Sequence, residues 1–148
     1  MPSSFNLATA ITFTSPAAAS TVVQTGTWDD LEEYDWFTLI GILTGATGGT
    51  LDVYLQSEIK SDVWVDWVHF PQKAAASAET RTAIDCRMSE SAMATTGGGS
   101  TAAPGVALAA SKVAFSHPGG KVRVVTVAGV GTSAGAAQTL YLLRWRQR

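Results

Sequence analysis

The sequence predicts an all-β protein, a single antiparallel β-sandwich with a jelly-roll-like arrangement of about eight strands. In several segments, apolar residues recur at every second position, which is the spacing of a half-buried strand. These segments follow one another at intervals of about 10–15 residues with Gly-rich turns between them, a rhythm typical of sandwiches and jelly rolls. The chain has 148 residues, enough for one domain over residues 1–148 to bury a core of its own.

The alternation is clearest in four segments. Residues 51–56 and 63–68 alternate apolar with polar side chains, and the short link between them predicts a hairpin. Residues 122–127 alternate in the same way, and in 140–146 the odd positions carry Tyr, Leu and Trp while the even positions carry Leu and Arg. Their β-branched and aromatic content suits a pleated sheet surface. Further strands are expected at 5–14, 21–27, 35–43, 81–88 and 112–115.

Three segments between the predicted strands have other properties. Residues 72–81 are rich in Ala and suit one or two helical turns, but they lack an apolar stripe and fit a polar loop equally well. The Gly spacing in 44–49 predicts a tight hairpin turn with positive φ angles, and a phosphate-binding loop is excluded because neither a Lys nor a helix follows it. Residues 94–105 are Gly-rich and flexible by composition, so they form either a mobile loop or one ordered by a partner.

Charge is scarce and is separated by sign along the chain. Only 15% of the residues are charged, with 10 Lys and Arg against 12 Asp and Glu, whereas about 25% is usual. Residues 1–66 hold nine acids and one base, and residues 121–148 hold five bases and no acid. This separation favours pairing of the two ends within one chain or, alternatively, between copies. The net charge of −2 argues against a nucleic-acid partner.

The N-terminus has no basic residue ahead of an apolar run, and the sequence contains no stretch of 18 apolar residues. We therefore expect neither a secretory signal nor a membrane span, and a soluble protein made in a cytoplasm.

Candidate catalytic residues are few and isolated. By alternation, His69 falls on the same strand face as Val63, Val65 and Trp67, and His117 precedes a Pro-Gly-Gly turn. Cys86 lies in a strand pattern and is the only cysteine, which excludes an intrachain disulfide and a Cys-based zinc site. We expect no catalytic residue, no cofactor and no metal site.

The acidic run Asp29–Asp35 lacks the ligand spacing of a calcium loop and is interpreted as a solvated turn.

The five Trp residues suggest either core and interface anchors or a platform for stacking sugars. Four of them lie in predicted strands, and Trp28 lies at a strand end. Trp64 and Trp67 have opposite parity, so both cannot face one ligand. This parity favours the role of anchors, with a carbohydrate-binding module as the alternative.

Part of the chain resembles small virion structural proteins of tailed bacteriophages. The resemblance lies in residues 45–56, GATGGTLDVYLQ, in residues 64–71, WVDWVHFP, and in the closing segment 140–145, LYLLRW. In that family the pattern runs GGTLDVYLQ, then W-x-D, then HF, and consists of fold residues rather than a reaction signature. The resemblance implies a β-sandwich with an assembly role and gives no catalytic residue.

The resemblance and the composition together predict a capsid decoration (cement) protein that stabilises a phage head by binding across major capsid protein junctions. A neck or tail adaptor is the alternative within the virion. We expect a homo-oligomer, a trimer by the resemblance, assembled in the host cytoplasm, with itself and the major capsid protein as partners. Residues 1–5 suit an arm that adds a strand to a neighbour. The expected interface residues are Phe5, Trp64, Trp67, Arg144, Arg146 and Arg148.

Overall fold

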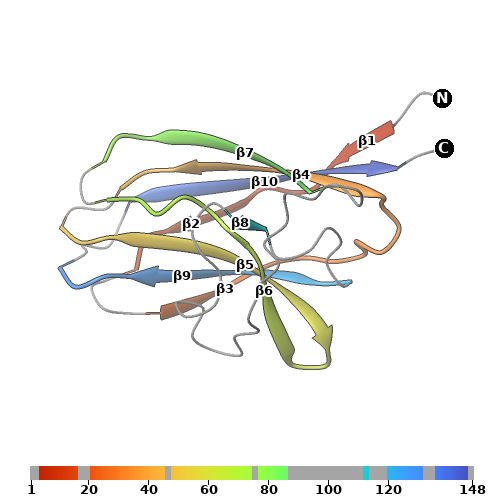
Figure 1. Cartoon of the computed structure of the whole chain (residues 1–148), viewed down its shortest axis with the longest axis horizontal. Helices are drawn as coiled ribbons and strands as arrows, with labels where there is room; N and C mark the ends of the chain where they lie inside the picture. Colours follow the sequence, from red (N-terminus) through yellow and green to blue (C-terminus); the bar gives the residue numbers. More distant parts are fainter. Residues whose placement is uncertain are drawn as a thin grey trace.

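The computed structural model describes residues 4–16, 21–45, 48–74, 77–86, 112–113, 120–131 and 136–146. In these residues the chain forms ten strands and no helix. The strands make two antiparallel sheets packed on each other, which confirms the predicted all-β sandwich. In Figure 1, β7, β4 and β10 occupy the upper half of the molecule, and β5, β9 and β3 lie below them.

We call the two sheets sheet A and sheet B, and each contains five strands. Sheet A consists of β1 (Ser4–Leu7), β2 (Ile11–Thr14), β4 (Trp36–Leu43), β7 (Thr80–Cys86) and β10 (Ala137–Arg146). Sheet B consists of β3 (Thr21–Trp28), β5 (Leu51–Lys60), β6 (Val63–His69), β8 (Lys112–Val113) and β9 (Val122–Ala128).

The strand order is that of a jelly roll. Sheet A runs β1–β10–β4–β7, with β2 also paired to β10, and sheet B runs β3–β9–β5–β6–β8. The first and last strands of the chain are therefore neighbours, and β3 pairs with the next-to-last strand, β9. This nesting of early strands with late ones is the double Greek key of a jelly roll, here with the short β8 added at one edge.

The core lies between the sheets and follows the strand alternation. On β4 the odd positions Phe37, Leu39 and Leu43 are buried, and the even positions between them are half-exposed. The ring of Phe37 meets the fully buried Trp67 of sheet B edge-on, with centroids 5.7 Å apart. Burying one such side chain stabilises the fold by about 1.5–3 kcal/mol.

The predicted strand 5–14 is one edge of sheet A with an interruption. Residues Ser4–Leu7 and Ile11–Thr14 pair with successive parts of β10, and the register shifts by one residue between them. The break at 8–10 lets Ala8 enter the core, while the backbone N–H of Ala8 still bonds to Leu142 O at 2.9 Å.

A β-bulge in β6 changes which side chains share a face. Leu55 pairs with Val68, but Gln56 pairs with Asp66, so two residues of β6 lie opposite one step of β5. As a result, Trp67 points into the core, whereas His69 pairs with Tyr54 on the outer face of sheet B. The prediction that His69 shares the face of Trp67 is therefore wrong, because an inserted residue reverses the alternation.

The predicted hairpin between 51–56 and 63–68 is present, with strands longer than expected. The β5 and β6 strands are joined by Ser61 and Asp62, and Asp62 has a φ of 60°. Figure 1 shows this hairpin projecting from the lower side of the sandwich.

The link 44–49 is not a hairpin, which corrects the prediction for this segment. It carries the chain from β4 in sheet A to β5 in sheet B. The positive φ expected there is found at Gly48, at 84°. A Cβ on Gly48 would collide with the carbonyl oxygen of Gly131 in the β9–β10 turn, so this close approach requires glycine.

The Ala-rich segment forms no helix in its described residues, 72–74 and 77–81. Lys73 instead makes an isolated bridge with Leu51, and its buried ammonium donates to Ala78 O and Thr80 Oγ1. This segment is therefore the loop alternative. The Gly-rich residues 94–105 lie outside the described part of the chain.

Candidate interaction surface

The outer face of sheet A carries a set of apolar side chains that face away from the core. Because the odd residues of β4 and the even residues of β10 point inward, their neighbours in sequence point outward. Across the two strands the outward residues stand side by side, Trp36 with Trp145 and Ile40 with Tyr141. We call this set the apolar face: Leu7, Trp36, Ile40, Ile42, Tyr141, Leu143 and Trp145.

The side chains of the apolar face are only partly covered. Leu7 is 56% exposed and pairs with Leu143, and the other six side chains are half-exposed. The rings of Trp36 and Trp145 stack with centroids 6.0 Å apart. The indole N–H of Trp145 donates to Thr38 Oγ1 at 3.1 Å, which satisfies its polar group within the sheet.

No Lys, Arg, Asp or Glu occupies an outward position of β4 or β10. The charged residues in register with this face belong to the edge strand β7, where Asp85 pairs with Thr38 and Arg81 with Ile42. The guanidinium Nε of Arg81 is 3.3 Å from Glu79 Oε1. An approaching surface therefore has little charge to desolvate over β4 and β10, which is the condition found at the cores of protein interfaces.

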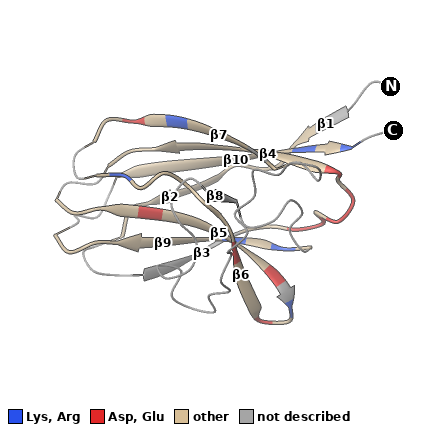
Figure 2. Ribbon diagram, in the orientation of Figure 1, with Lys and Arg blue, Asp and Glu red and all other residues tan. Residues whose placement is uncertain are grey.

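The basic end of β10 is engaged within its own chain. Arg146 bonds to both the side chain and the backbone carbonyl of Glu33. Arg144 donates to Asn6 Oδ1 at 2.9 Å, and both guanidinium groups lie over the ring of Tyr34. Figure 2 shows the acidic loop between β3 and β4 beside the basic end of β10. The separated charges thus pair within one chain.

The structure revises several of the predicted interface residues. Phe5 pairs by its backbone with Trp145 of the same chain, so residues 4 and 5 belong to an intrachain strand rather than to an arm. Trp67 is in the core and is not available to a partner, which corrects its assignment. Trp64 lies on the outer face of sheet B under the guanidinium of Arg123, 4.3 Å from the ring centroid. Residues 1–3 and Arg148 lie outside the described residues.

The outer face of sheet B differs from that of sheet A because its central side chains are polar and yet buried. Tyr54 and Gln56 of β5 and Asp66 and His69 of β6 are all buried. We call this group, with the adjoining Asp52 and Arg123, the polar cluster. Sequence alternation did not find it, because polar residues at outward positions ordinarily indicate solvent.

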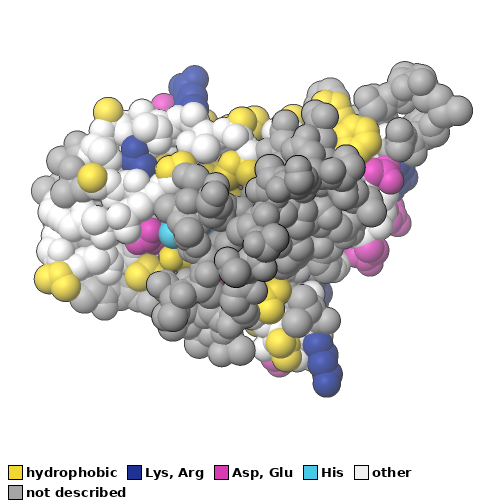
Figure 3. All heavy atoms as spheres, viewed as in Figure 1, with side chains coloured by type: hydrophobic (Ala, Val, Ile, Leu, Met, Phe, Trp, Pro, Cys, Tyr) yellow, Lys and Arg dark blue, Asp and Glu magenta, His cyan; other side chains and the backbone are white. Residues whose placement is uncertain are grey.

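One half of the polar cluster is a histidine held by a carboxylate. His69 Nε2 lies 2.9 Å from Asp52 Oδ1, and the imidazole stacks on the ring of Tyr54 with centroids 3.9 Å apart. Burial raises the pKa of Asp52, but hydrogen bonds from His69 and Gln72 outweigh it and leave the pKa lowered. Burial also raises the pKa of Tyr54, so its hydroxyl keeps its proton. In Figure 3 a histidine is visible beside an acidic side chain.

The other half links an arginine to an aspartate through an amide. Arg123 donates from Nε and Nη2 to Gln56 Oε1 at 3.0 and 2.8 Å, and Gln56 Nε2 donates to Asp66 Oδ1 at 2.8 Å. Asp66 Oδ2 is buried and has no hydrogen-bond partner in the described part of the chain. Burial therefore raises the pKa of Asp66, although Gln56 and His69 partly offset the rise. Burial likewise lowers the pKa of Arg123.

Cys86 and His69 lie in different sheets. Cys86 is opposite Phe37 in sheet A and is buried, whereas His69 is on the outer face of sheet B. Within the described ranges, no three His, Cys, Asp or Glu side chains are placed to hold a metal ion. No helix of the described chain is long and apolar enough to cross a membrane.

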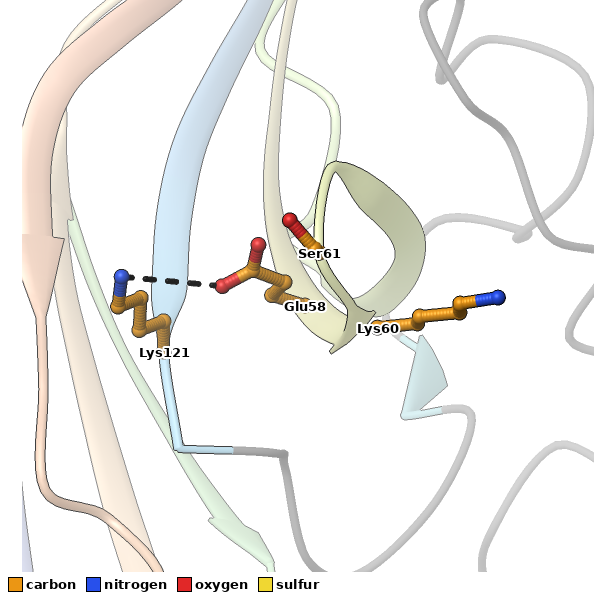
Figure 4. A pocket seen from close by; sticks show the side chains of 4 residues that line it. All are labelled: Glu58, Lys60, Ser61 and Lys121. Atoms are coloured by element: carbon orange, nitrogen blue, oxygen red, sulfur yellow. Dashed lines mark ion pairs between the residues drawn. The ribbon is translucent and has the colours of Figure 1, made fainter.

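A shallow hollow of about 330 Å³ lies beside the turn of the β5–β6 hairpin. Figure 4 shows its lining residues, with Glu58 directed toward Lys121 and the side chain of Lys60 extending away from both. Lys121 Nζ is 4.0 Å from Glu58 Oε2, and Glu58 Oε1 accepts a bond from the backbone N–H of Asp62 at 2.9 Å. The carboxylate of Glu58 thus holds the turn of the hairpin.

No protein-family model, curated protein or solved structure matches this chain.

Proposed function

We propose that this protein is a non-enzymatic structural protein of a tailed-bacteriophage virion, a capsid decoration protein that binds across junctions between major capsid proteins. The observation that carries the proposal is the apolar face, an almost uncharged sheet surface whose side chains remain partly exposed. Apolar sheet surfaces of this kind are typical of proteins that are covered by other proteins. The motif resemblance and the jelly roll, a fold used by viral capsid domains, support the same role.

The proposed mechanism is the burial of surface on the assembled particle. A protein that binds the shell only in its assembled form stabilises that form by mass action. The scarcity of charge reduces the cost of removing water from the contact. Since Arg146 is already paired with Glu33, attraction between opposite charges contributes little to the proposed binding.

The test adds purified protein to capsids that lack it and measures the melting temperature of the shell. We expect the melting temperature to rise with protein concentration until the sites are filled. Leu143→Lys should reduce this rise, because it places a charge in the apolar face. The matched control is Val130→Lys, at an 86% exposed residue in the β9–β10 turn, which should leave the rise unchanged.

An unchanged melting temperature at saturating protein would contradict the proposal. The copy number in purified virions then distinguishes a decoration protein from an adaptor. A decoration protein covers the shell, whereas an adaptor forms a single ring at the neck or tail. A few copies at one vertex would replace decoration by the adaptor role.

A further inference from the structure

We infer that the apolar face is covered by a second copy of this chain, in a two-fold symmetric dimer that packs sheet A on sheet A. The inference rests on the proposed assembly role and assigns the apolar face to a second copy, so that the unit that binds the shell is the dimer. It depends on three observations: the size of the face, its lack of charge, and the different character of sheet B.

The size of the apolar face suits a stable contact between two sheets. Sheet A is four strands wide, and its central strand β4 has eight residues. At ~4.8 Å between strands and ~3.4 Å per residue, the face measures ~19 by ~27 Å, or ~500 Å² in projection. A standard interface buries ~800 Å² of accessible surface on each partner. A pleated face of this footprint, with its rim, supplies most of that area.

The charge pattern permits a face to meet its own copy. In a two-fold contact the residues near the axis meet their own copies, so charges of one sign close to the axis disfavour self-pairing. The central ladder of this face holds Thr38, Ile40 and Ile42 on β4 opposite Leu143, Tyr141 and Thr139 on β10. None of these six side chains is ionised, and the charged residues in register with them, Arg81 and Asp85, belong to the edge strand β7.

The difference between the outer faces of sheet A and sheet B indicates a two-fold symmetric contact. A ring of three copies is built from two different surfaces that fit each other, whereas a two-fold contact uses one surface twice. The outer face of sheet B carries the polar cluster and cannot serve as an apolar counterpart of sheet A. Among the residues that the structure describes, this is the one apolar face, so it matches only itself, and the contact closes at two copies rather than at the expected three.

The geometry of the dimer follows from sheet packing. Two sheets stack ~10 Å apart with their strands crossing at about −30°. The centre of the ladder lies at the pair Ile40 and Tyr141, so the two-fold axis passes near these residues. Each Tyr141 then faces the Tyr141 of the second copy across the contact.

The first experiment measures the molar mass of the full chain by light scattering over a range of concentrations, without capsids. We expect twice the chain mass for the wild type and for Val130→Lys, and a shift toward one chain mass for Leu143→Lys. Leu7→Lys changes an exposed residue at the edge of the face and leaves the core unaltered. It should weaken the dimer at least tenfold. Circular dichroism shows whether each variant is folded. If Leu143→Lys does not fold, Leu7→Lys still tests the inference.

The second experiment tests the symmetry with a short bis-maleimide. Because Cys86 is 2% exposed, it reacts slowly in the folded protein, and Tyr141→Cys introduces a thiol close to the axis. We expect rapid conversion of Tyr141→Cys to covalent dimers and none for Val130→Cys. A monomer or a trimer in light scattering, or equal cross-linking of the two variants, would overturn the inference.

These outcomes are separate from those of the capsid test. If the protein is a monomer and still raises the melting temperature of capsids, the inference fails and the proposed function stands. If the protein is a dimer that leaves capsids unchanged, the inference stands and the proposed function fails.

Discussion

At the scale of single residues, the carboxylate of Asp66 is buried with incomplete hydrogen bonding. The residue is 1% exposed, and its Oδ2 has no hydrogen-bond partner among the described residues. Arg123 reaches Asp66 through Gln56 rather than directly. A buried charge with one hydrogen bond is a cost to stability, and protonation removes that cost.

We therefore expect Asp66 to make the protein less stable as pH rises. Because its pKa is raised above the unfolded value of 3.8, its charge is disfavoured only in the folded state. The free energy of unfolding should then be highest below pH 3.8 as far as this group is concerned, and fall as pH rises through the folded pKa. Asp66→Asn should remove this dependence and add about 1 kcal/mol at pH 7. Urea unfolding from about pH 2 to pH 8 measures both effects.

Asp52 should show the opposite sign and provides the comparison. Its pKa is lowered by His69 and Gln72, so it stabilises the fold above the unfolded value of 3.8, and this contribution is lost as pH falls through the folded pKa. Asp52→Asn should lower the free energy of unfolding at pH 7 by about 1 kcal/mol. Equal pH profiles for the two variants would contradict the assignment.

At the scale of elements, alternation predicted the strands correctly and failed where the chain departs from a period of two. The faces of β10 follow the prediction, because no residue is inserted between Ala137 and Arg146. In β6 one extra residue moves His69 to the other face, and no residue type marks such a bulge. The link 44–49 was expected to join neighbours, since alternation does not tell to which sheet the next strand belongs.

The polar cluster shows why the candidate site was harder to predict than the fold. Gln56 and Asp66 occupy outward positions and are read from sequence as solvated, yet both are buried. The apolar face, by contrast, is visible in sequence as the odd residues of 140–146. Its partners on β4 could not be assigned, because pairing between residues about 100 positions apart comes from the three-dimensional register.

The link 44–49, which connects sheet A to sheet B, gives a prediction about Gly48 and its neighbour Gly131. Gly48 and Gly131 both have positive φ, 84° and 85°, but only at Gly48 would a Cβ strike backbone. The left-handed conformation alone costs an L-residue about 1–2 kcal/mol. Gly131→Ala should therefore lower the free energy of unfolding by about 1 kcal/mol, and Gly48→Ala by at least 2 kcal/mol. Chemical denaturation of the pair checks this, and equal losses would show that the collision is relieved.

At the scale of the whole molecule, opposite charges from distant parts of the sequence meet within one chain. The acidic loop and the basic strand end meet through Glu33 and Arg146, and the apolar face has no ionised side chain in its central ladder. In the proposed dimer, association therefore uses the apolar face rather than these charges.

We expect self-association to be almost independent of salt. Screening at 0.5 M salt shortens the range of charge interactions to a few ångströms, which weakens contacts made by exposed ions and leaves apolar burial unaffected or stronger. Sedimentation equilibrium at 0.05 and 0.5 M NaCl should give dissociation constants within about threefold of each other. A loss of association at high salt would indicate that the contact is made by charges instead.

The two-layer structure of the sandwich also determines how many attachment sites the proposed dimer presents. If sheet A is turned inward between two copies, both sheets B become the outer layers of a four-layer stack, with ~30 Å between the outermost sheets at ~10 Å per layer. The two β5–β6 hairpins, which project from the sheet B side of each copy, then stand on opposite ends of the pair. Such an object is a bivalent connector, and two weak attachments made at once hold far more tightly than either alone.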